Sequence, residues 1–558
     1  MANKYHPFSI APSLQFLTAR IQSFSKKSIN KRVVYLSLQA ILNAIVIGII
    51  AKGLVLLIDL ITNLSFFGKF SFEPASPAGN ALGRWVLLVP IAGALIVGLI
   101  ARFGSKAIRG HGIPEAMEKI ISSDSKIPPA LTILKPVSAA ISIGTGGPFG
   151  AEGPIIATGG AFGSWIGQMI HISSRERKTL LAAGATAGMA TIFGTPMAAI
   201  LLALELLLFE FSPKSIIPVA LACITGAAMH LLLFESVPVF HSASIEAATL
   251  SSIWIYILIG AIIGIVSVII SKLIYWIEDQ FERLPIHWMW WPAIGAVAVG
   301  IAGYYAPNTL GVGYENIHGV LNGKFTPAML ISLFIFKLIS WSISLGSGTS
   351  GGTLAPLLTI GGALGALLGL LFIEIFPSTG ISIVTCSLVG MAALFAGASR
   401  AVFTSVVFAI ETTGQFNGLY PVLAGCTMAY LISMLLMKTS IMSEKINRRG
   451  ILTPDTYEPD ILQYAPVTAA RIIEENHAVS ETIGEKETIG IAINKMVKKK
   501  TDRLAILSEK NNSEILGLIS KESIIDFYHL SKRKDTSYHS PNKTKRIIVF
   551  WRKTLKIH

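Results

Sequence analysis

The chain of 558 residues contains two versions of one glycine-rich segment, and this duplication constrains its fold more than any other feature. The two segments begin 202 positions apart and read Gly144-Thr-Gly-Gly-Pro-Phe-Gly-Ala-Glu-Gly-Pro154 and Gly346-Ser-Gly-Thr-Ser-Gly-Gly-Thr-Leu-Ala-Pro356. The same offset pairs residues on both sides of them: Lys135 with Lys337, Ser138 with Ser340, Gly159-Gly160-Ala161 with Gly361-Gly362-Ala363, Gly163 with Gly365, and Gly188-Met189-Ala190 with Gly390-Met391-Ala392. Agreement in one register over dozens of positions indicates a duplicated structural unit.

The composition places this duplication in a membrane. Hydrophobic residues make up 52% of the chain, charged residues only 14%, and the mean hydropathy is +0.62, all outside the range of soluble globular proteins. Apolar runs long enough to span a bilayer recur at Leu38–Leu60, Trp85–Ile100, Ile253–Ile270, Pro292–Tyr305 and Tyr420–Met437. We therefore predict an all-α multi-pass membrane protein. Glycine-rich interruptions at corresponding places of two apolar halves are typical of a transporter whose site lies where broken helices meet.

The sequence divides into four parts. We expect a polar N-terminal segment over 1–34 and a transmembrane domain over 35–450, with repeat halves at about 40–235 and 250–440. A segment at 451–530 has the pattern of a small α/β unit: a helix at 488–497, strands at 503–507 and 515–519 around Asn511-Asn512, and a helix from Ser523. Residues 531–558 form a basic tail, interpreted as a solvated segment or as one attracted to anionic lipid.

The distribution of charge predicts the orientation. No cleavable signal peptide is visible, and four cations precede the first span (Lys26, Lys27, Lys31 and Arg32). Positive charge at that end predicts a cytoplasmic N-terminus. We expect both termini in the cytoplasm and the protein in a bacterial inner membrane. The net charge of +14 does not indicate nucleic-acid binding, because much of the excess lies outside the spans.

Broken helices explain the glycines. Interrupted helices are tolerated inside a bilayer only where they are buried in protein or line a cavity. The free N–H groups and the dipole at a helix start then form an anion site, and glycine allows the ion to approach the backbone. A third instance of this pattern is Gly110-His-Gly-Ile-Pro-Glu115, and its degenerate partner Gly311-Val-Gly-Tyr-Glu-Asn316 follows 201 positions later. Several helix starts are thus expected to converge on one anion.

Three of these segments resemble the signatures of the CLC chloride channels and proton/chloride antiporters. The family patterns GSGIP, GxEGP and GxFxP correspond to Gly110–Pro114, Gly150–Pro154 and Gly352–Pro356. The resemblance covers about residues 40–450 and implies a homodimer in which each subunit has its own anion pathway, built from two inverted-topology repeats. It assigns anion binding to Gly110, His111, Gly112, Ile113, Gly150, Gly153, Gly352, Thr353, Leu354, Ala355 and Met442, and places the gating glutamate at Glu152.

Glu152 can also be interpreted without the family. A carboxylate among helix N–H groups occupies the place of an anion, and its protonation or displacement would release that place. The alternative is a glutamate that only caps a helix start, where acidic residues are common.

Four residues depart from the family pattern. His111 replaces the usual serine, and its imidazole either donates to the anion and titrates near neutrality or turns away. Met442 replaces a tyrosine that supplies a hydroxyl, Leu354 replaces the phenylalanine of the third signature, and Ala151 replaces a basic residue. Because the serine position separates anion preferences in the family, nitrate and fluoride stay open as substrates beside chloride.

The proton route is also unusual. At the family's intracellular proton-transfer glutamate this chain has Leu206, which cannot carry a proton. Glu205 is interpreted as structural because Glu411 repeats it, and the possible substitutes are Glu210, Glu115 and Glu118. We predict a chloride channel, proton-activated or voltage-dependent and gated by Glu152. The alternative is a proton/chloride antiporter with a non-standard inner proton route.

Other classes of membrane protein account for fewer of these sequence features. A solute symporter of another inverted-repeat fold would account for the duplication but not for three ordered signatures, and no catalytic dyad or His-Glu-x-x-His motif indicates an intramembrane enzyme. We expect no cofactor, metal or nucleic acid; the three cysteines Cys223, Cys386 and Cys426 are interpreted as small packing residues. Residues 460–530 faintly resemble one CBS module, for which no ligand is assigned, and a generic α/β cap is the alternative.

Overall fold

The computed structural model describes residues 31–122, 125–170, 172–234, 238–449, 467–470, 481–485, 487–508 and 515–536. The chain forms two compact units, Met1–Asp455 and Thr456–His558, and each is described by itself. Residues 1–30, with Lys26 and Lys27, the stretch 450–466 and the part of the basic tail after 536 lie outside the described residues.

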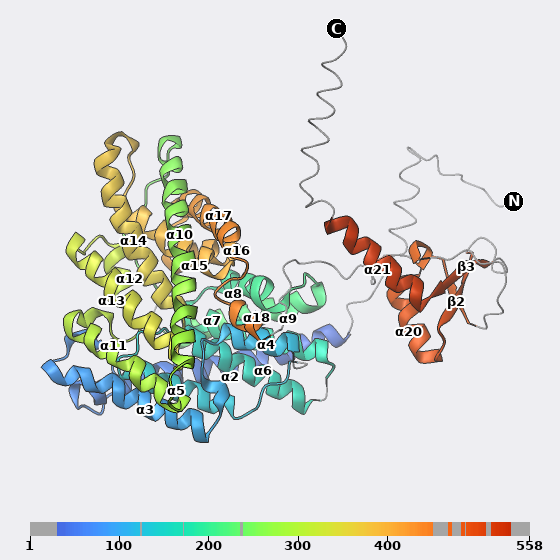
Figure 1. Cartoon of the computed structure of the whole chain (residues 1–558), viewed down its shortest axis with the longest axis horizontal. Coiled ribbons are helices and arrows are strands. Elements are labelled where there is room, and N and C mark those ends of the chain that lie inside the picture. Colours follow the sequence, from blue (N-terminus) through green and yellow to red (C-terminus); the bar gives the residue numbers. More distant parts are fainter. Residues whose placement is uncertain are drawn as a thin grey trace, which may run out of the picture. The chain divides into compact units, whose positions relative to one another are not determined.

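The first unit is a bundle of helices (Figure 1). Its α-helices in chain order are α2 (Lys31–Thr62), α3 (Leu88–Phe103), α4 (Ile113–Ser122), α5 (Leu131–Gly144), α6 (Glu152–Met169), α7 (Ser174–Phe193), α8 (Pro196–Leu202), α9 (Pro213–Leu233), α10 (Leu250–Glu282), α11 (Trp291–Tyr305), α12 (Tyr314–Leu321), α13 (Pro327–Gly346), α14 (Leu354–Ile375), α15 (Ile383–Ser399), α16 (Val402–Thr413), α17 (Leu419–Leu436) and α18 (Glu444–Arg448). Short 3-10 or π-helical turns connect or extend them, at Asn63–Phe67, Pro77–Gly79, Gly83–Leu87, Lys106–Ile108, Ala203–Leu208, Trp288–Trp290, Pro307–Thr309, Pro377–Thr379 and Phe416–Gly418.

Seven helical segments of the described residues are long and apolar enough to cross a membrane: Lys31–Phe67, Gly83–Phe103, Pro213–Leu233, Leu250–Glu282, Pro327–Gly346, Leu354–Ile375 and Phe416–Leu436. Shorter apolar helices accompany them, among them α5, α15 and α16. The prediction of an all-α multi-pass membrane protein is confirmed. The run Pro292–Tyr305 forms α11, which at 15 residues is shorter than these seven.

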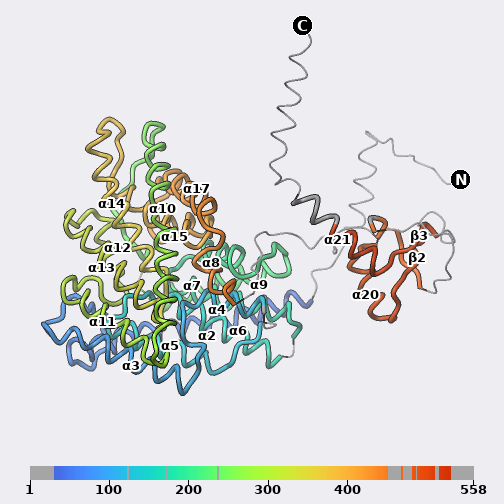
Figure 2. The backbone as a smooth tube through the Cα atoms, viewed as in Figure 1, coloured from blue at the N-terminus to red at the C-terminus, as the bar shows by residue number. Residues whose placement is uncertain are grey.

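The two halves repeat one arrangement of helices. Helix α6 packs on α7 as α14 packs on α15, and α2 packs on α9 as α10 packs on α17. Between the halves, α3 lies beside α11, as the blue and yellow-green segments of Figure 2 show, and α8 contacts α16. The duplication seen in the sequence is therefore a duplication of packing.

The offset between the halves changes along the chain, which corrects one of the sequence pairings. Gly184 follows Gly159 by 25 positions, whereas Gly390 follows Gly361 by 29, so the second half gains four residues between these glycines (29 − 25 = 4). A Cβ on Gly159 would overlap the carbonyl oxygen of Gly184 across α6 and α7, and one on Gly361 would meet that of Gly390 across α14 and α15. Gly184, and not Gly188, is therefore the structural equivalent of Gly390. At these close approaches glycine lets two apolar helices come into backbone contact.

Reciprocal caps join the halves near α8 and α16. The carboxylate of Glu205 accepts hydrogen bonds from the backbone N–H groups of Phe403 and Thr404 at 3.0 and 2.8 Å. Glu411 accepts in the same way from Met197 and Ala198 at 3.1 and 2.8 Å. Each glutamate satisfies the free N–H groups at the start of the other half's helix. The structural interpretation of Glu205 is confirmed.

The second unit contains a three-stranded sheet with order β1-β2-β3. Its elements are a 3-10 turn (Val467–Ala470), β1 (Thr482–Gly484), α20 (Ile489–Lys499), β2 (Arg503–Leu507), β3 (Ile515–Ser520) and α21 (Lys521–Thr536). Strand β1 pairs parallel with β2, which pairs antiparallel with β3. The predicted strands and helices of this α/β segment are confirmed, whereas β1, only three residues long, was not anticipated.

Candidate anion and proton site

The glycine-rich loops of the two halves meet in the middle of the first unit. Gly110 forms a parallel bridge with Ser350, and Gly150 forms an antiparallel bridge with Gly352. Two backbone hydrogen bonds carry these contacts, from Gly110 N–H to Thr349 at 3.1 Å and from Gly352 N–H to Gly150 at 3.2 Å. The starts of α4, α6 and α14 are thereby brought to one place, as the sequence predicted.

Two buried lysines hold the loops from behind. Lys135 donates from its Nζ to the carbonyl oxygens of Ile108 and Gly110 at 2.7 and 2.9 Å. Lys337, its equivalent in the second half, donates to the carbonyls of Thr309 and Gly311, both at 3.0 Å. Each ammonium thus satisfies carbonyl groups just before a broken helix.

Glu152 begins α6, and its side chain is fully buried between the loops. A Cβ on Gly150 would overlap Oε2 of Glu152, and one on Gly352 would lie 3.1 Å from it. The backbone N–H of Ala355, at the start of α14, faces the same carboxylate. Within the described part of the chain Oε2 has no hydrogen-bond partner. The carboxylate thus fills a space that glycines of both halves leave open.

Tyr314 contacts Glu152 from the opposite half, and the sequence did not single it out. Its hydroxyl donates a hydrogen bond to Oε1 of Glu152 at 3.3 Å. The residue starts α12, after Gly313 in the left-handed conformation at φ 78°. It belongs to the degenerate partner of Gly110–Glu115, so the internal repeat was the available signal.

The 110–113 loop packs directly against α6. A Cβ on Gly153 would overlap the carbonyl oxygen of His111, and one on Gly112 would overlap that of Gly153. The His111 side chain is 6% exposed, and its Nδ1 has no partner among the described residues. Gly112 N–H donates to Oε2 of Glu115 at 2.6 Å, so that N–H is occupied in this structure. Ile113 is buried and begins α4.

The remaining predicted anion residues are all buried. Thr353, Leu354 and Ala355 are buried at the start of α14. Met442 is fully buried in the turn before α18, next to Ile441, whose carbonyl accepts from the Tyr275 hydroxyl at 2.7 Å. Among the described residues no group of three or more His, Cys, Asp or Glu is arranged to hold a metal ion.

The candidate inner proton groups are in different environments. Leu206 is 5% exposed in the π-helical turn after α8, so it gives no polar link. Glu210 accepts from Ser215 at 2.5 Å and pairs with Arg175 at 3.4 Å. Glu115 pairs with Lys445 at 3.4 Å, and Glu118 pairs with Arg449.

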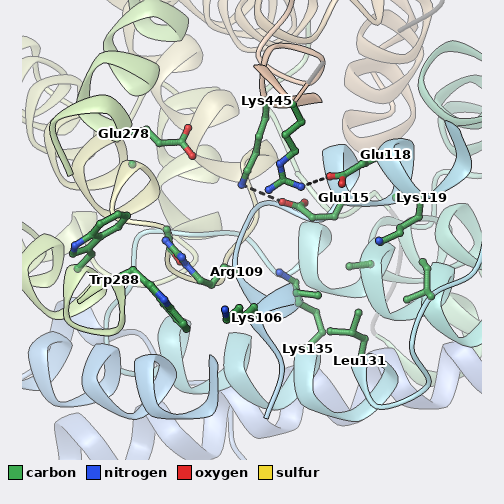
Figure 3. A pocket seen from close by; sticks show the side chains of 18 of the residues that line it. Lys106, Arg109, Glu115, Glu118, Lys119, Leu131, Lys135, Glu278, Trp288 and Lys445 are labelled. Atoms are coloured by element: carbon green, nitrogen blue, oxygen red, sulfur yellow. Dashed lines mark hydrogen bonds and ion pairs between the residues drawn. The ribbon is translucent and has the colours of Figure 1, made fainter. Parts of the chain in front are cut away.

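A cavity of about 540 Å³ lies on one side of the loops, and we call it the basic cavity. Six cationic and four acidic side chains line it: Lys106, Arg109, Lys119, Lys135, Lys445, Arg449, Glu115, Glu118, Glu278 and Glu282. Figure 3 shows the pairs of Glu115 and Glu118 on one wall and Lys106, Arg109 and Trp288 on another. Arg109 also lies over the rings of Trp288 and Trp291, at 5.0 and 5.6 Å from their centroids. The excess of cations favours anions in this cavity.

A smaller cavity of about 230 Å³ lies next to Glu152, and we call it the acidic cavity. Ala151 and Tyr314 are part of its wall, and its charged lining residues are Asp59 and Glu315. The two cavities are at different ends of α5, because Leu131 and Lys135 line the basic one and Ile143 the acidic one. Glu152 therefore lies between a cation-rich and a carboxylate-lined space.

Known proteins share this architecture. A family model described as voltage gated chloride channel matches residues 92–434. The chain is 33% identical over 376 residues to the H(+)/Cl(-) exchange transporter ClcA of Yersinia pseudotuberculosis serotype IB (strain PB1/+), which covers 64% of this chain and 77% of that relative. The chain belongs to the CLC family. ClcA of Vibrio campbellii (strain ATCC BAA-1116) is 30% identical over 393 residues, covering 67% of this chain and 82% of the relative.

Solved structures agree on the fold of this CLC protein. A slow cyanobacterial Cl-/H+ antiporter matches with a TM-score of 0.68 and 22% identity over 76% of this chain and 99% of its own. A CLC-type fluoride/proton antiporter matches with a TM-score of 0.59 and 22% identity over 75% of this chain and 98% of its own. The predicted fold of two inverted repeats of tilted and broken helices is confirmed, and the protein is an anion transporter of the CLC family.

Proposed function

We propose that this protein exchanges chloride for protons across a bacterial inner membrane. The two relatives at 33% and 30% identity are named H(+)/Cl(-) exchange transporters, which favours the antiporter alternative over the channel that the sequence predicted. The observation that carries the proposal is the Glu152 carboxylate, buried in the space beside Gly150 and Gly352, which we call the glycine cradle. One of its oxygens is bound by Tyr314, and the other has no partner among the described residues.

Glu152 is the shared element of both transport steps. Ionised, its carboxylate occupies the cradle and faces the helix-start N–H of Ala355, as a bound anion would. Protonated, it loses the charge that holds it there, so chloride takes its place. A proton and a chloride ion thus use the cradle in turn, and movement of one requires movement of the other.

The basic cavity is the anion access route on the cytoplasmic side. Its cations raise the local concentration of anions next to the 110–113 loop. Lys445 and Arg449 follow the last span, and Lys119 follows the broken helix start, so positive charge gathers on this face as expected of cytoplasmic segments. This assignment agrees with the cytoplasmic location proposed for both termini.

Glu115 is the proposed inner proton group. It lines the basic cavity and touches the loop through Gly112 N–H, whereas Glu210 is held by Ser215 and Arg175 outside that cavity wall. Glu118 also lines the cavity and pairs with Arg449, whereas Glu115 binds the loop itself. Glu115→Gln keeps an acceptor for Gly112 N–H and removes the titrating group. We expect this variant to move chloride with a proton flux reduced about a hundredfold, the lower end of the range of single general acid groups.

Chloride is the proposed substrate, and His111 is the residue proposed to adjust the preference among anions. Its buried Nδ1 without a partner leaves one imidazole nitrogen available at the loop. A homodimer with one pathway in each subunit is proposed from the family resemblance alone, and the described part of residues 451–530 is proposed to be a cytoplasmic α/β segment.

Uphill proton transport tests the proposal. Purified protein in liposomes is given an outward chloride gradient, a pH probe and no other permeant ion except a potassium/valinomycin clamp. Protons should accumulate against their gradient in wild type and not in Glu152→Gln. Chloride efflux that leaves the pH unchanged in wild type would reject exchange in favour of a channel.

A further inference from the structure

The acidic cavity has a property that the exchange reaction does not by itself explain. It opens next to Glu152, and one residue, Tyr314, both lines the cavity and donates to the Glu152 carboxylate. We propose that this cavity is the proton access route to Glu152 and that Tyr314 passes the proton on, with Asp59 collecting protons at the cavity wall. The inference rests on the proposed exchange of chloride for protons and names residues for its second ion.

The Tyr314 hydroxyl is held in place by aromatic packing. Its ring lies edge-on to Phe193 and Phe240, with centroids 5.9 and 5.6 Å away. Phe193 is itself fixed edge-on against Phe408 at 4.9 Å. Such contacts restrict the ring to one orientation, so the hydroxyl keeps its direction toward Oε1. A proton relay requires a hydroxyl that is held in one direction and that also contacts a space large enough for water, and Tyr314 meets both conditions.

The charges around the cavity select protons over anions. Asp59 from α2 and Glu315 from α12 line it, and none of its described lining residues is Lys, Arg or His. Two cations face these groups from neighbouring sites: Lys337 of α13 faces Glu152, and Lys52 of α2 faces Asp59. The Lys337 ammonium is engaged by two backbone carbonyls, and neither cation is part of the cavity wall. A carboxylate-lined space attracts hydronium and repels chloride, the reverse of the basic cavity.

Asp59 is suited to collect the proton. Its side chain is half-buried on the cavity wall, and the backbone N–H of Ala75 is its hydrogen-bond partner. It is thereby fixed at the cavity without being closed off from it. Its negative charge also favours the protonated form of a carboxyl nearby.

The transfer conserves atoms and charge at each residue. Tyr314 gives its hydroxyl proton to Oε1 of Glu152, and its oxygen takes a proton from a hydronium ion in the cavity. The hydronium becomes water, the tyrosine is neutral before and after, and the carboxylate becomes a neutral carboxyl. The reverse sequence returns the proton to the cavity.

Two substitutions test the route. Tyr314→Phe keeps the ring packing and removes the hydroxyl, and Asp59→Asn removes the charge. Tyr256→Phe is the matched control, because Tyr256 is a buried tyrosine of α10 that lines neither cavity. Chloride-driven proton transport is measured in liposomes from pH 4.5 to 7.5. We expect Tyr314→Phe to slow chloride-driven proton transport about a hundredfold at pH 7, with a smaller difference at pH 4.5 where hydronium is abundant.

Asp59→Asn should move the midpoint of the pH profile to lower pH by about 0.5 to 1 unit, because it removes one negative charge that favours protonation of Glu152. The Glu152→Gln protein cannot carry protons, so it separates a role of Tyr314 in proton transfer from a role in anion transport. Glu152→Gln and the double variant Glu152→Gln/Tyr314→Phe should carry equal anion flux. Equal flux also shows that a protein with Tyr314→Phe folds. Equal pH profiles of Tyr314→Phe and wild type would overturn the route while leaving exchange intact. A loss of anion flux in the Glu152→Gln background would overturn it too, because the hydroxyl would then serve the anion. Wild type that moves no protons uphill would overturn exchange and this inference together.

Discussion

Glu152→Gln should tighten chloride binding and abolish proton coupling. The substitution keeps the shape of the side chain and an oxygen that accepts from Tyr314, while it removes a negative charge from the cradle. The amide N–H₂ then takes the place of the unpartnered Oε2. A buried N–H without an acceptor is unfavourable by about 1 to 3 kcal/mol, so the amide is stabilised when an anion accepts its hydrogen bond.

The magnitude follows from the charge. A carboxylate about 4 Å from a bound chloride repels it by about 1 kcal/mol in water and about 4 kcal/mol at an effective dielectric constant of about 20. Since about 1.4 kcal/mol is a factor of ten, removing the charge should increase chloride affinity between about 5-fold and about 700-fold. Titration calorimetry in detergent measures this change, with Glu374→Gln, an exposed glutamate of α14, as the control. Affinity within twofold of wild type, together with retained proton coupling, would refute the assignment of Glu152 to the anion site.

Further predictions concern the 110–113 loop, the reciprocal caps of Glu205 and Glu411, and the basic cavity. His111→Ser should change the chloride/nitrate flux ratio and weaken any pH dependence near the ordinary imidazole pKa of about 6.5, as measured by anion efflux from liposomes; an unchanged ratio and profile would mean that the imidazole does not act on the anion. Glu205→Ala should lower the free energy of unfolding by about 2 kcal/mol, because the α16 N–H groups lose their acceptor, and thermal unfolding in detergent should register it. The anion preference of that variant should be unchanged, and a shift in preference without loss of stability would contradict a purely structural role. Glu115→Gln should retain chloride efflux at a reduced proton flux, and normal coupling in this variant would exclude Glu115 as the inner proton group.

The repeat in the sequence predicted much of the fold because duplicated packing leaves duplicated residues. Lys135 and Lys337 were paired by their sequence offset alone, and in the structure both donate hydrogen bonds to carbonyl groups of the loops. The pairing failed at Gly188, since a constant offset cannot register the four residues that the second half gains between Gly361 and Gly390. Helix contacts, and not sequence spacing, define equivalence beyond that point.

The site was predictable only as far as local motifs reach. The glycine pattern identified Glu152 and the loops that meet around it, because an anion site at a helix start is a local property. The contact of Tyr314 with Glu152 spans 162 positions and depends on how α12 packs against α6 through other helices. The same holds for Glu115, whose partner Lys445 lies 330 positions away. Neither contact has a local signature.

The potential at which net transport stops tests the central proposal, exchange of chloride for protons, most directly. With a tenfold chloride gradient and no pH gradient, a channel carries no net flux at the chloride equilibrium potential, about 59 mV at 25 °C. Adding a pH gradient leaves that potential unchanged for a channel and displaces it for an exchanger, because protons then contribute to the driving force. We predict that the zero-flux potential of wild type in liposomes shifts with the pH gradient and that Glu152→Gln returns it to the chloride value. A wild-type potential that stays at the chloride value across all pH gradients would contradict the account.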